Sequence, residues 1–451
     1  MKKIFYAIFM AIILCSCKKY LDIKSDKTLV VPLTLQDAQA LLDAYGRLNN
    51  SYPSSGSISD DDFYVSDVFF NTMTTANQNI YAWNKNALID NDWSLMYTNV
   101  LYANEALETI EKITPDGSNI ADWKRLKGTA LFFRSYALYH AAQYFSEPYN
   151  KSIAATKPGI PLRLQSDVNI PDVRSSMQET YDQIITDLLS ASTLLPVSVA
   201  PVSRPSRAAA FGALARIYLA IGEYELSGKY ADSCLQLNSS LLNYNSLDVN
   251  AAAPFIRFNT EVIFPGTIQV SSVLGVSNWR ADTILYQSYN ANDLRKKLFF
   301  KTNGSGTALF FGFKGSYDGT TTGSIFNGLT VDEMYLTRAE CFARQGNIIA
   351  AMNDLNTLLV TRWKTGTYIP YTSVTADDAL TKILSERRKE LVARAIRWFD
   401  LRRLNQDNRF AKTLTRLIGG VIYQLVPNDT RYTFYIPSSV ISFTGMQQNT
   451  R

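Results

Sequence analysis

The chain has 451 residues, 46% of them hydrophobic and 19% charged, so it can form one large folded domain or two. Its 45 Lys and Arg residues outnumber its 40 Asp and Glu residues by five, a balance that excludes a strongly basic nucleic-acid-binding protein. Aromatic residues make up 12% of the chain. Aromatic faces left at a surface suit flat or amphipathic ligands such as sugar rings, so the composition permits glycan binding.

The N-terminus predicts an export signal. Lys2 and Lys3 precede the apolar run 4–14, which is too short to be a permanent membrane helix. The run ends in Leu-Cys-Ser-Cys, which resembles the bacterial lipobox, where a small residue precedes an acylated cysteine. This resemblance predicts a signal peptide 1–16, lipid on Cys17 and membrane anchoring without a transmembrane helix. The alternative is an ordinary secretory signal cut near Ser16.

Cysteine count excludes a disulfide framework in the mature chain. Cys15 leaves with the signal and Cys17 takes the lipid, so Cys234 and Cys341 remain. Both lie within apolar helical patterns, and we expect them to be buried free thiols.

A polar tether, residues 17–33, is expected to lead into one folded domain, residues 34–451. Thr34 is the predicted cap of the first helix. Residues from about 50 to 90 are rich in Ser, Asn and Asp, which predicts a loop region with short helices. Residues from about 240 to 330 are rich in Gly, Ser, Thr and Asn, which predicts loops with short strands.

Apolar periodicity predicts a mainly helical chain. A helix rich in small residues stops at Gly222 and is followed by a second amphipathic helix, and the same pattern recurs around Gly346. Each of these helix pairs resembles the tetratricopeptide unit. Such a pair cannot bury its apolar face alone, so the pairs must stack. The predicted helices are 93–113, 122–144, 176–195, 207–221, 223–237, 331–345, 348–360 and 376–404.

Four segments carry a resemblance to the SusD/RagB family. Segment 17–23 has the family's opening of lipid cysteine, polar pair, aromatic, Leu and Asp, and 127–138 is similar to its Arg-Ser-Tyr helix. Segment 386–403, with Glu-Arg-Arg-Lys-Glu-Leu and Arg-Trp-Phe-Asp-Leu-Arg-Arg, is the most specific, and 435–449 completes the set. Many members carry Glu-Gly where this chain has Arg394-Ala395, which puts a close turn or a charge pairing there in doubt.

The resemblance implies a SusD-like fold of tetratricopeptide-type helix pairs with a loop-rich, irregular ligand-binding face. It implies a non-catalytic outer-membrane lipoprotein that faces the cell exterior, captures oligosaccharides or glycan fragments and delivers them to a TonB-dependent, SusC-like transporter. No cofactor is expected. Two alternatives stay open: the same fold binding peptides or another nutrient, and a surface glycoside hydrolase whose paired carboxylates lie apart in sequence.

Candidate catalytic groups have structural interpretations that we favour. In the charged stretch 386–403 the carboxylates and arginines recur at helical spacing, which favours ion pairs that lock the C-terminal helix to the body. His140, the only histidine, lies in an apolar helix and is expected to be a satisfied core or groove residue. The run 60–62 of three Asp residues lacks EF-hand spacing, which favours a hydrogen-bonding loop over a metal site.

Two tryptophans in polar, irregular stretches are the main candidate ligand contacts. A ring face can stack on a pyranose while a neighbouring amide or guanidinium donates to hydroxyls. A loop aromatic tucked back into the body is an equally supported interpretation. The candidate ligand-binding residues are Trp83 with Asn84, Trp279 with Arg280, and, more weakly, Asp61, Tyr286 and Tyr289.

Overall fold

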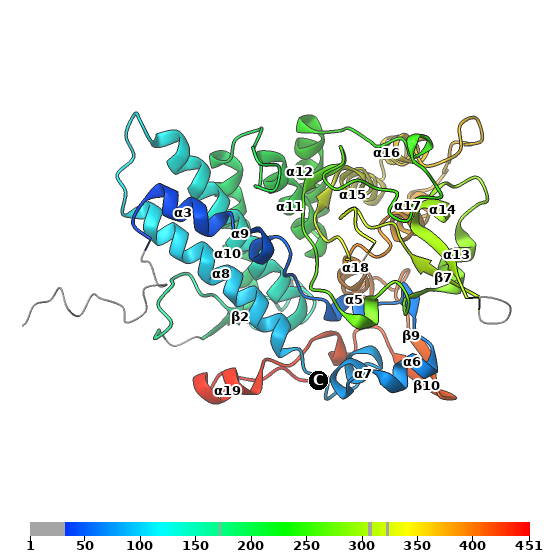
Figure 1. The fold of residues 1–451 in the computed structure, drawn as a ribbon, viewed down its shortest axis with the longest axis horizontal. Coiled ribbons are helices and arrows are strands. Elements are labelled where there is room, and N and C mark those ends of the chain that lie inside the picture. Colours follow the sequence, from blue (N-terminus) through cyan, green and yellow to red (C-terminus); the bar gives the residue numbers. More distant parts are fainter. Residues whose placement is uncertain (1–31, 171–172, 305–308, 322–323) are drawn as a thin grey trace, which may run out of the picture.

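The computed structural model describes residues 32–170, 173–304, 309–321 and 324–451. Long helices fill the left and upper parts of the molecule in Figure 1, and short helices, strands and loops fill the remainder. The predicted mainly helical fold is confirmed. The long helices are α8 (Asp90–Glu111), α9 (Ile120–Phe145), α10 (Met177–Leu194), α11 (Arg207–Ala220), α12 (Tyr224–Leu237), α15 (Val331–Arg344), α16 (Ile348–Leu359) and α17 (Ala376–Glu390).

The helices stack in chain order. Helix α9 lies between α8 and α10, α10 contacts α11, and α11 pairs with α12. Helix α12 then packs on α15, which in turn contacts α16 and α17, so the two predicted helix pairs meet although about a hundred residues separate them (Figure 1). The expectation that such pairs must stack is confirmed, and the stack forms the scaffold behind the loop-rich face.

The two helix pairs share their local chemistry. Helix α11 starts at Ser206, whose hydroxyl accepts the Ala209 N–H, and it buries small residues on nearly every side. Gly222 follows α11 with φ +78 and Gly346 follows α15 with φ +79. Glycine adopts this left-handed conformation without strain, which permits the sharp turn into the next helix. Arg216 of α11 joins the pairs through the buried Glu333 of α15, with Nε 2.7 Å from Oε1.

The prediction of one continuous helix over residues 376–404 is wrong. Helix α17 ends at Glu390, and α18 spans Arg397–Leu404. Between them Ala393 and Ala395 take left-handed φ values of 52 and 55, and the Asp62 carboxylate accepts the Ala393 N–H at 3.2 Å. Tertiary contacts therefore override a helical sequence pattern, and the close turn forms with alanine at position 395.

Most short elements come from the two predicted loop regions, which pair with each other. Strand β1 of the first region pairs antiparallel with β5 of the second, Tyr64 opposite Arg280. From the first region come α5 (Ser55–Ser59), β1 (Phe63–Tyr64), α6 (Asp67–Thr72) and α7 (Thr75–Tyr81), after α3 (Leu35–Leu42) and α4 (Tyr45–Leu48). From the second come β4 (Val262–Phe264), β5 (Arg280–Ala281), α13 (Thr283–Ser288), α14 (Arg295–Phe299), β6 (Phe300–Asn303), β7 (Phe310–Phe313) and β8 (Leu329–Thr330).

All the sheets of the described chain have two strands. Strand β6 pairs antiparallel with β7, β4 with β8, and β2 (Pro158–Pro161) with β3 (Arg174–Ser176). Near the C-terminus β9 (Leu414–Ile418) and β10 (Val421–Leu425) form a hairpin, followed by α19 (Ser438–Thr444).

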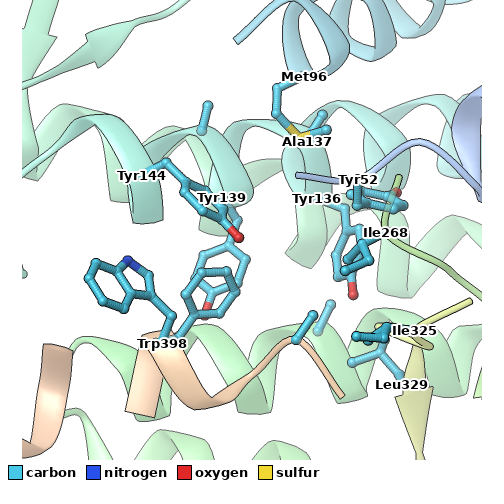
Figure 2. Close-up of a cluster of buried hydrophobic side chains, with 14 of the residues drawn as sticks. Tyr52, Met96, Tyr136, Ala137, Tyr139, Tyr144, Ile268, Ile325, Leu329 and Trp398 are labelled. Carbon is cyan, nitrogen blue, oxygen red and sulfur yellow. The ribbon is translucent and has the colours of Figure 1, made fainter. Parts of the chain in front are cut away.

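An aromatic core joins the scaffold to α18. Figure 2 shows Tyr136, Tyr139 and Tyr144 of α9 projecting toward Trp398 of α18 and Leu329 of β8. Trp398 is buried, as predicted for a core anchor.

His140 lies in this core, with its ring centre 4.7 Å from that of Tyr52 and 4.8 Å from that of Tyr136. Burial keeps its pKa well below the usual value, so the ring is neutral. Neither nitrogen has a hydrogen-bond partner among the described residues, which corrects the expectation of a satisfied side chain.

Several predictions concern the ends and the thiols. The signal 1–16, Cys17 and most of the tether 17–33 lie outside the described residues. Cys234 and Cys341 are buried and free, as predicted. Within the described ranges, we find no helix with the length and apolar character needed to cross a membrane.

Candidate ligand-binding surface

The charged stretch 386–403 is built into buried ion pairs. The Glu390 carboxylate lies 2.7 Å from Arg362 Nε and 2.9 Å from Arg295 Nη1, and all three side chains are fully buried. Arg295 also contacts Glu386 at 2.6 Å. Burial opposes ionisation of Glu390, but Arg362 and Arg295 outweigh it and lower its pKa. The structural interpretation of this stretch is confirmed, because its carboxylates fasten α17 to α14 and to Arg362.

The three aspartates at 60–62 are also engaged within the protein. The Asp61 carboxylate lies 2.6 Å from Arg397 Nε, 2.7 Å from Lys412 Nζ and 3.2 Å from Arg388 Nη2. Burial raises the pKa of Asp61, but Arg397 and Arg388 more than offset this and hold it well below the usual value. The described residues contain no group of three or more His, Cys, Asp or Glu positioned to hold a metal ion. Asp61 therefore has little acceptor capacity left for a ligand hydroxyl.

Both candidate tryptophans are core residues. Trp83 and Trp279 are each 2% exposed. The Trp83 indole N–H donates to the Ser59 carbonyl at 2.8 Å, and the Trp279 ring stacks on Phe63 with ring centres 5.7 Å apart. The interpretation of these rings as surface platforms is wrong, and the tucked-in alternative holds. Neighbouring polar residues in sequence could not reveal that distant elements cover both rings.

The other candidate residues have different environments. Asn84 is exposed, and its side-chain oxygen accepts the Asn86 N–H at 2.9 Å. Tyr289 is buried, and its hydroxyl donates to the Lys389 carbonyl at 2.7 Å. Arg280 and Tyr286 are both partly exposed, and each contacts a phenylalanine of β7.

We define the aromatic strip as Tyr64, Arg280, Tyr286, Phe310 and Phe311, from β1, β5, α13 and β7. Tyr64 is 36% exposed and lies opposite Arg280 in the β1–β5 pair. The Arg280 guanidinium carbon is 4.3 Å from the centre of the Phe310 ring. Tyr286 stacks on Phe311 with ring centres 3.7 Å apart and planes at 11°. The strip thus groups four aromatic rings and one cation around β7, with the Arg280–Phe310 contact and the Tyr286–Phe311 stack on opposite faces of that strand. Helix α13 and β7 lie side by side at the right of Figure 1.

Local structure explains why these rings remain at the surface. Side chains alternate along a strand, so Phe311 and Phe313 share one face of β7 while Phe310 lies on the other. Phe313 enters the core against Trp279, and Phe311 stays partly exposed under Tyr286. Helix α13 starts where Asp282 accepts the Leu285 N–H at 2.9 Å, which orients Tyr286 toward β7.

Arg280 has unused hydrogen-bonding capacity. Its side chain contacts the Phe310 ring but has no ion pair or hydrogen bond with another described residue, and its Nε lacks a partner among them. Because the Arg280 side chain is partly exposed and its guanidinium has no hydrogen-bond partner in the described part of the chain, it can donate hydrogen bonds to a ligand at the surface. The strip can therefore offer flat apolar faces together with guanidinium donors, which is what a sugar ring with hydroxyls requires.

Sequence reasoning missed Tyr64, Phe310 and Phe311. Both phenylalanines lie in the region from about 240 to 330, which the sequence predicts only as loops with short strands. Two consecutive aromatic residues on a strand point to opposite faces, and this was the available signal for an outward-facing ring. Nothing near Tyr64 in the sequence indicates that β1 pairs with β5, because more than two hundred residues separate the strands.

Another hollow, with a volume of about 790 Å³, lies between α10 and residues 162–170 and 173–175. None of its described lining residues is aromatic. It therefore offers no stacking face, and we favour the aromatic strip as the candidate ligand-binding surface.

Two family models match the chain. The model described as "Starch-binding associating with outer membrane" matches residues 19–219, and the model described as "SusD family" matches residues 331–439. A comparison with curated proteins finds no match.

Solved structures from Bacteroides share the fold. A SusD superfamily protein from Bacteroides thetaiotaomicron superposes with a TM-score of 0.74 at 22% identity, over 93% of this chain and 100% of the other. A SusD-like carbohydrate binding protein from Bacteroides vulgatus gives 0.68 at 21% identity, over 91% and 96%. Surface glycan-binding protein A from Bacteroides uniformis gives 0.72 at 16% identity, over 92% and 98%. These structures show that the fold is shared, and the two family models, which match residues 19–219 and 331–439, show that the chain belongs to the SusD/RagB family.

Proposed function

We propose that this protein is a non-catalytic, lipid-anchored surface protein that captures oligosaccharides on the aromatic strip. The observation that carries the proposal is the exposed pairing of aromatic rings with a cation that has no partner among the described residues. The family model for starch-binding proteins of the outer membrane supports the ligand class.

The chemistry of the strip fits a glycan chain. Tyr64 presents a face on which the apolar side of a sugar ring packs. Tyr286 stacks on Phe311 and has Lys296 Nζ 4.7 Å from its ring centre, so it supports the strip from beside β7. Arg280 donates hydrogen bonds to ring hydroxyls from beside Phe310. Each stacking contact contributes about 1 kcal/mol, so several sugar units in a row would be needed for firm binding. A strip, rather than a closed pocket, suits an oligosaccharide of some length.

The environment of the acidic groups supports binding without hydrolysis. A glycosidase needs two carboxyl groups facing a substrate, one of them free to act as nucleophile or base. Glu386, Glu390 and Asp61 are instead held in ion pairs with arginines. The only histidine of the sequence, His140, lies in the aromatic core.

Anchoring and delivery are parts of the same proposal. Lipid on Cys17 would hold the protein at the outer membrane, facing the exterior, with residues 17–33 as a tether and residues 34–451 as one domain. The helical stack would meet a TonB-dependent, SusC-like transporter, and the aromatic strip would hold the ligand for transfer. Protease treatment of intact cells tests the orientation: digestion supports surface exposure, and resistance until lysis contradicts it.

The decisive test of function is a glycan array probed with the soluble form that begins after Cys17. We expect binding without release of reducing ends, and at least about tenfold weaker binding by Tyr286→Ala and Arg280→Gln. The matched control is Phe443→Ala, because Phe443 is 82% exposed on α19 and outside the strip. Binding of peptides instead of glycans, or release of sugars, would overturn the proposal.

A further inference from the structure

A second surface feature lies apart from the aromatic strip. It is an open groove of about 700 Å³ where the end of α4, the first turns of α8 and the segment 269–270 meet. We define the amide groove by five of its lining residues, none of them in the strip: Arg47, Asn50, Asn91, Tyr102 and Gln269.

The amide side chains of this groove have hydrogen-bonding groups that are free to bind a ligand. Asn91 Nδ2 donates to Gln269 Oε1 at 2.7 Å, which fixes both side chains across the groove and leaves Asn91 Oδ1 and Gln269 Nε2 free. Asn50 Oδ1 accepts from Thr267 Oγ1 at 3.2 Å, and its Nδ2 stays free. The groove therefore presents oriented donors and an acceptor, the combination that sugar hydroxyls match because each can donate and accept.

Charge in the groove has one sign. Arg47 is exposed and has no ion pair or hydrogen bond with another described residue. The acidic residue nearest to it in sequence, Asp43, is held by Arg204 at 2.7 Å. None of the described residues that line the groove is acidic. An exposed guanidinium without an acidic partner favours the binding of an anion. Its planar arrangement of N–H groups can donate two hydrogen bonds to one carboxylate.

An apolar surface completes the groove. Tyr102 and Leu95 are two helical turns apart on α8 and line the groove, and the Tyr102 hydroxyl has no partner among the described residues. An aromatic ring beside amides provides a packing face for a sugar ring. A ligand here would thus carry a ring, several hydroxyls and a negative charge.

We infer that the amide groove binds an acidic sugar unit, with Arg47 holding its carboxylate and Asn91 and Gln269 holding its hydroxyls. The inference rests on the proposed glycan binding but uses residues separate from the aromatic strip. The protein would therefore prefer glycans that contain uronic acids over their neutral equivalents.

The test is calorimetric titration of the full protein, purified in mild detergent, with oligogalacturonate and with the same oligosaccharide after reduction of its carboxyl groups. We expect the acidic form to bind at least about tenfold more tightly at low salt, because a hydrogen-bonded charge is worth more than a neutral contact. Higher salt should weaken this preference. A sulfated oligosaccharide that binds as well as the acidic one would overturn the assignment of a carboxylate.

Variants separate this inference from the proposed function. Arg47→Gln should abolish the preference for the acidic form, and Arg47→Lys should restore part of it. Tyr286→Ala in the strip should weaken both forms equally and leave the preference unchanged. Equal binding of both forms by the unaltered protein, or a preference that survives Arg47→Gln, would refute the inference while glycan binding stands. Failure to bind any glycan would refute both.

Discussion

Replacing Glu390 by Gln should destabilise the protein while keeping its shape. Glu390 Oε1 accepts from Arg362 Nε at 2.7 Å and Oε2 from Arg295 Nη1 at 2.9 Å. The amide keeps one acceptor but turns an NH₂ group toward an arginine, and it removes the negative charge of residue 390. Breaking a buried ion pair from one side costs about 3–5 kcal/mol.

The remaining contacts set the magnitude within that range. Arg362 keeps Glu261 at 2.7 Å, and Arg295 keeps Asp293 at 2.7 Å and Glu386 at 2.6 Å. Neither arginine is left without an anion, so we expect a loss near the lower end, about 3 kcal/mol in the free energy of unfolding. With an unfolding entropy of roughly 2.1 cal/mol/K per residue, this corresponds to a Tm about 3–4 °C lower.

Scanning calorimetry of Glu390→Gln beside Glu225→Gln measures this effect. Glu225 is exposed at the start of α12, so its substitution should change the free energy of unfolding by less than about 0.5 kcal/mol. Adding Arg362→Met to Glu390→Gln should cost less than the sum of the single changes by about 1 kcal/mol or more, because both belong to one network. If the Tm of Glu390→Gln lies within about 1 °C of the Tm of the unaltered protein, as for a surface substitution, the account of this network is refuted.

Three further predictions concern pH, backbone strain and anchoring. Burial raises the pKa of Asp92 to about 6, so the folded state binds a proton more tightly than the unfolded chain and this residue's contribution to stability is lost as pH rises from about 4 through 6. Urea unfolding measures the free energy of unfolding of Asp92→Asn relative to the unaltered protein. This difference should shift in favour of the variant by about 1–3 kcal/mol between pH 4 and pH 8, and a difference that stays constant would contradict the prediction. Ala395→Gly should raise the free energy of unfolding by up to about 1 kcal/mol, because φ at this position is 55, whereas Ala213→Gly inside α11 should lower it by about 1 kcal/mol. Cys17→Ala should abolish palmitate labelling and release the protein from membranes, and retained labelling would exclude Cys17 as the acylated residue.

The helical scaffold could be predicted because its signals are local. Caps such as Thr34, turn glycines such as Gly222 and Gly346, and the apolar period of each helix lie within a few residues of the element they define. The break at Ala393 and Ala395 could not be predicted, since it depends on Asp62, which lies more than three hundred residues away.

The candidate surface was predicted only in part for the same reason. Arg280 and Tyr286 were chosen from a polar stretch, and the structure brings them into one strip. Trp83 was chosen by the same reasoning and is covered by Arg416, whose guanidinium carbon is 4.6 Å from the ring centre. Residue type and local polarity indicate a ligand surface, but the pairing of distant strands decides which rings stay exposed.

The central claim is that the aromatic strip captures glycans. Titration of the unaltered protein, Tyr286→Ala and Phe443→Ala with a glycan identified on the array tests it most directly. The account predicts that Tyr286→Ala binds at least about tenfold more weakly, while Phe443→Ala binds like the unaltered protein. Equal affinity of all three proteins for that glycan would show that the ligand binds elsewhere and would contradict the claim.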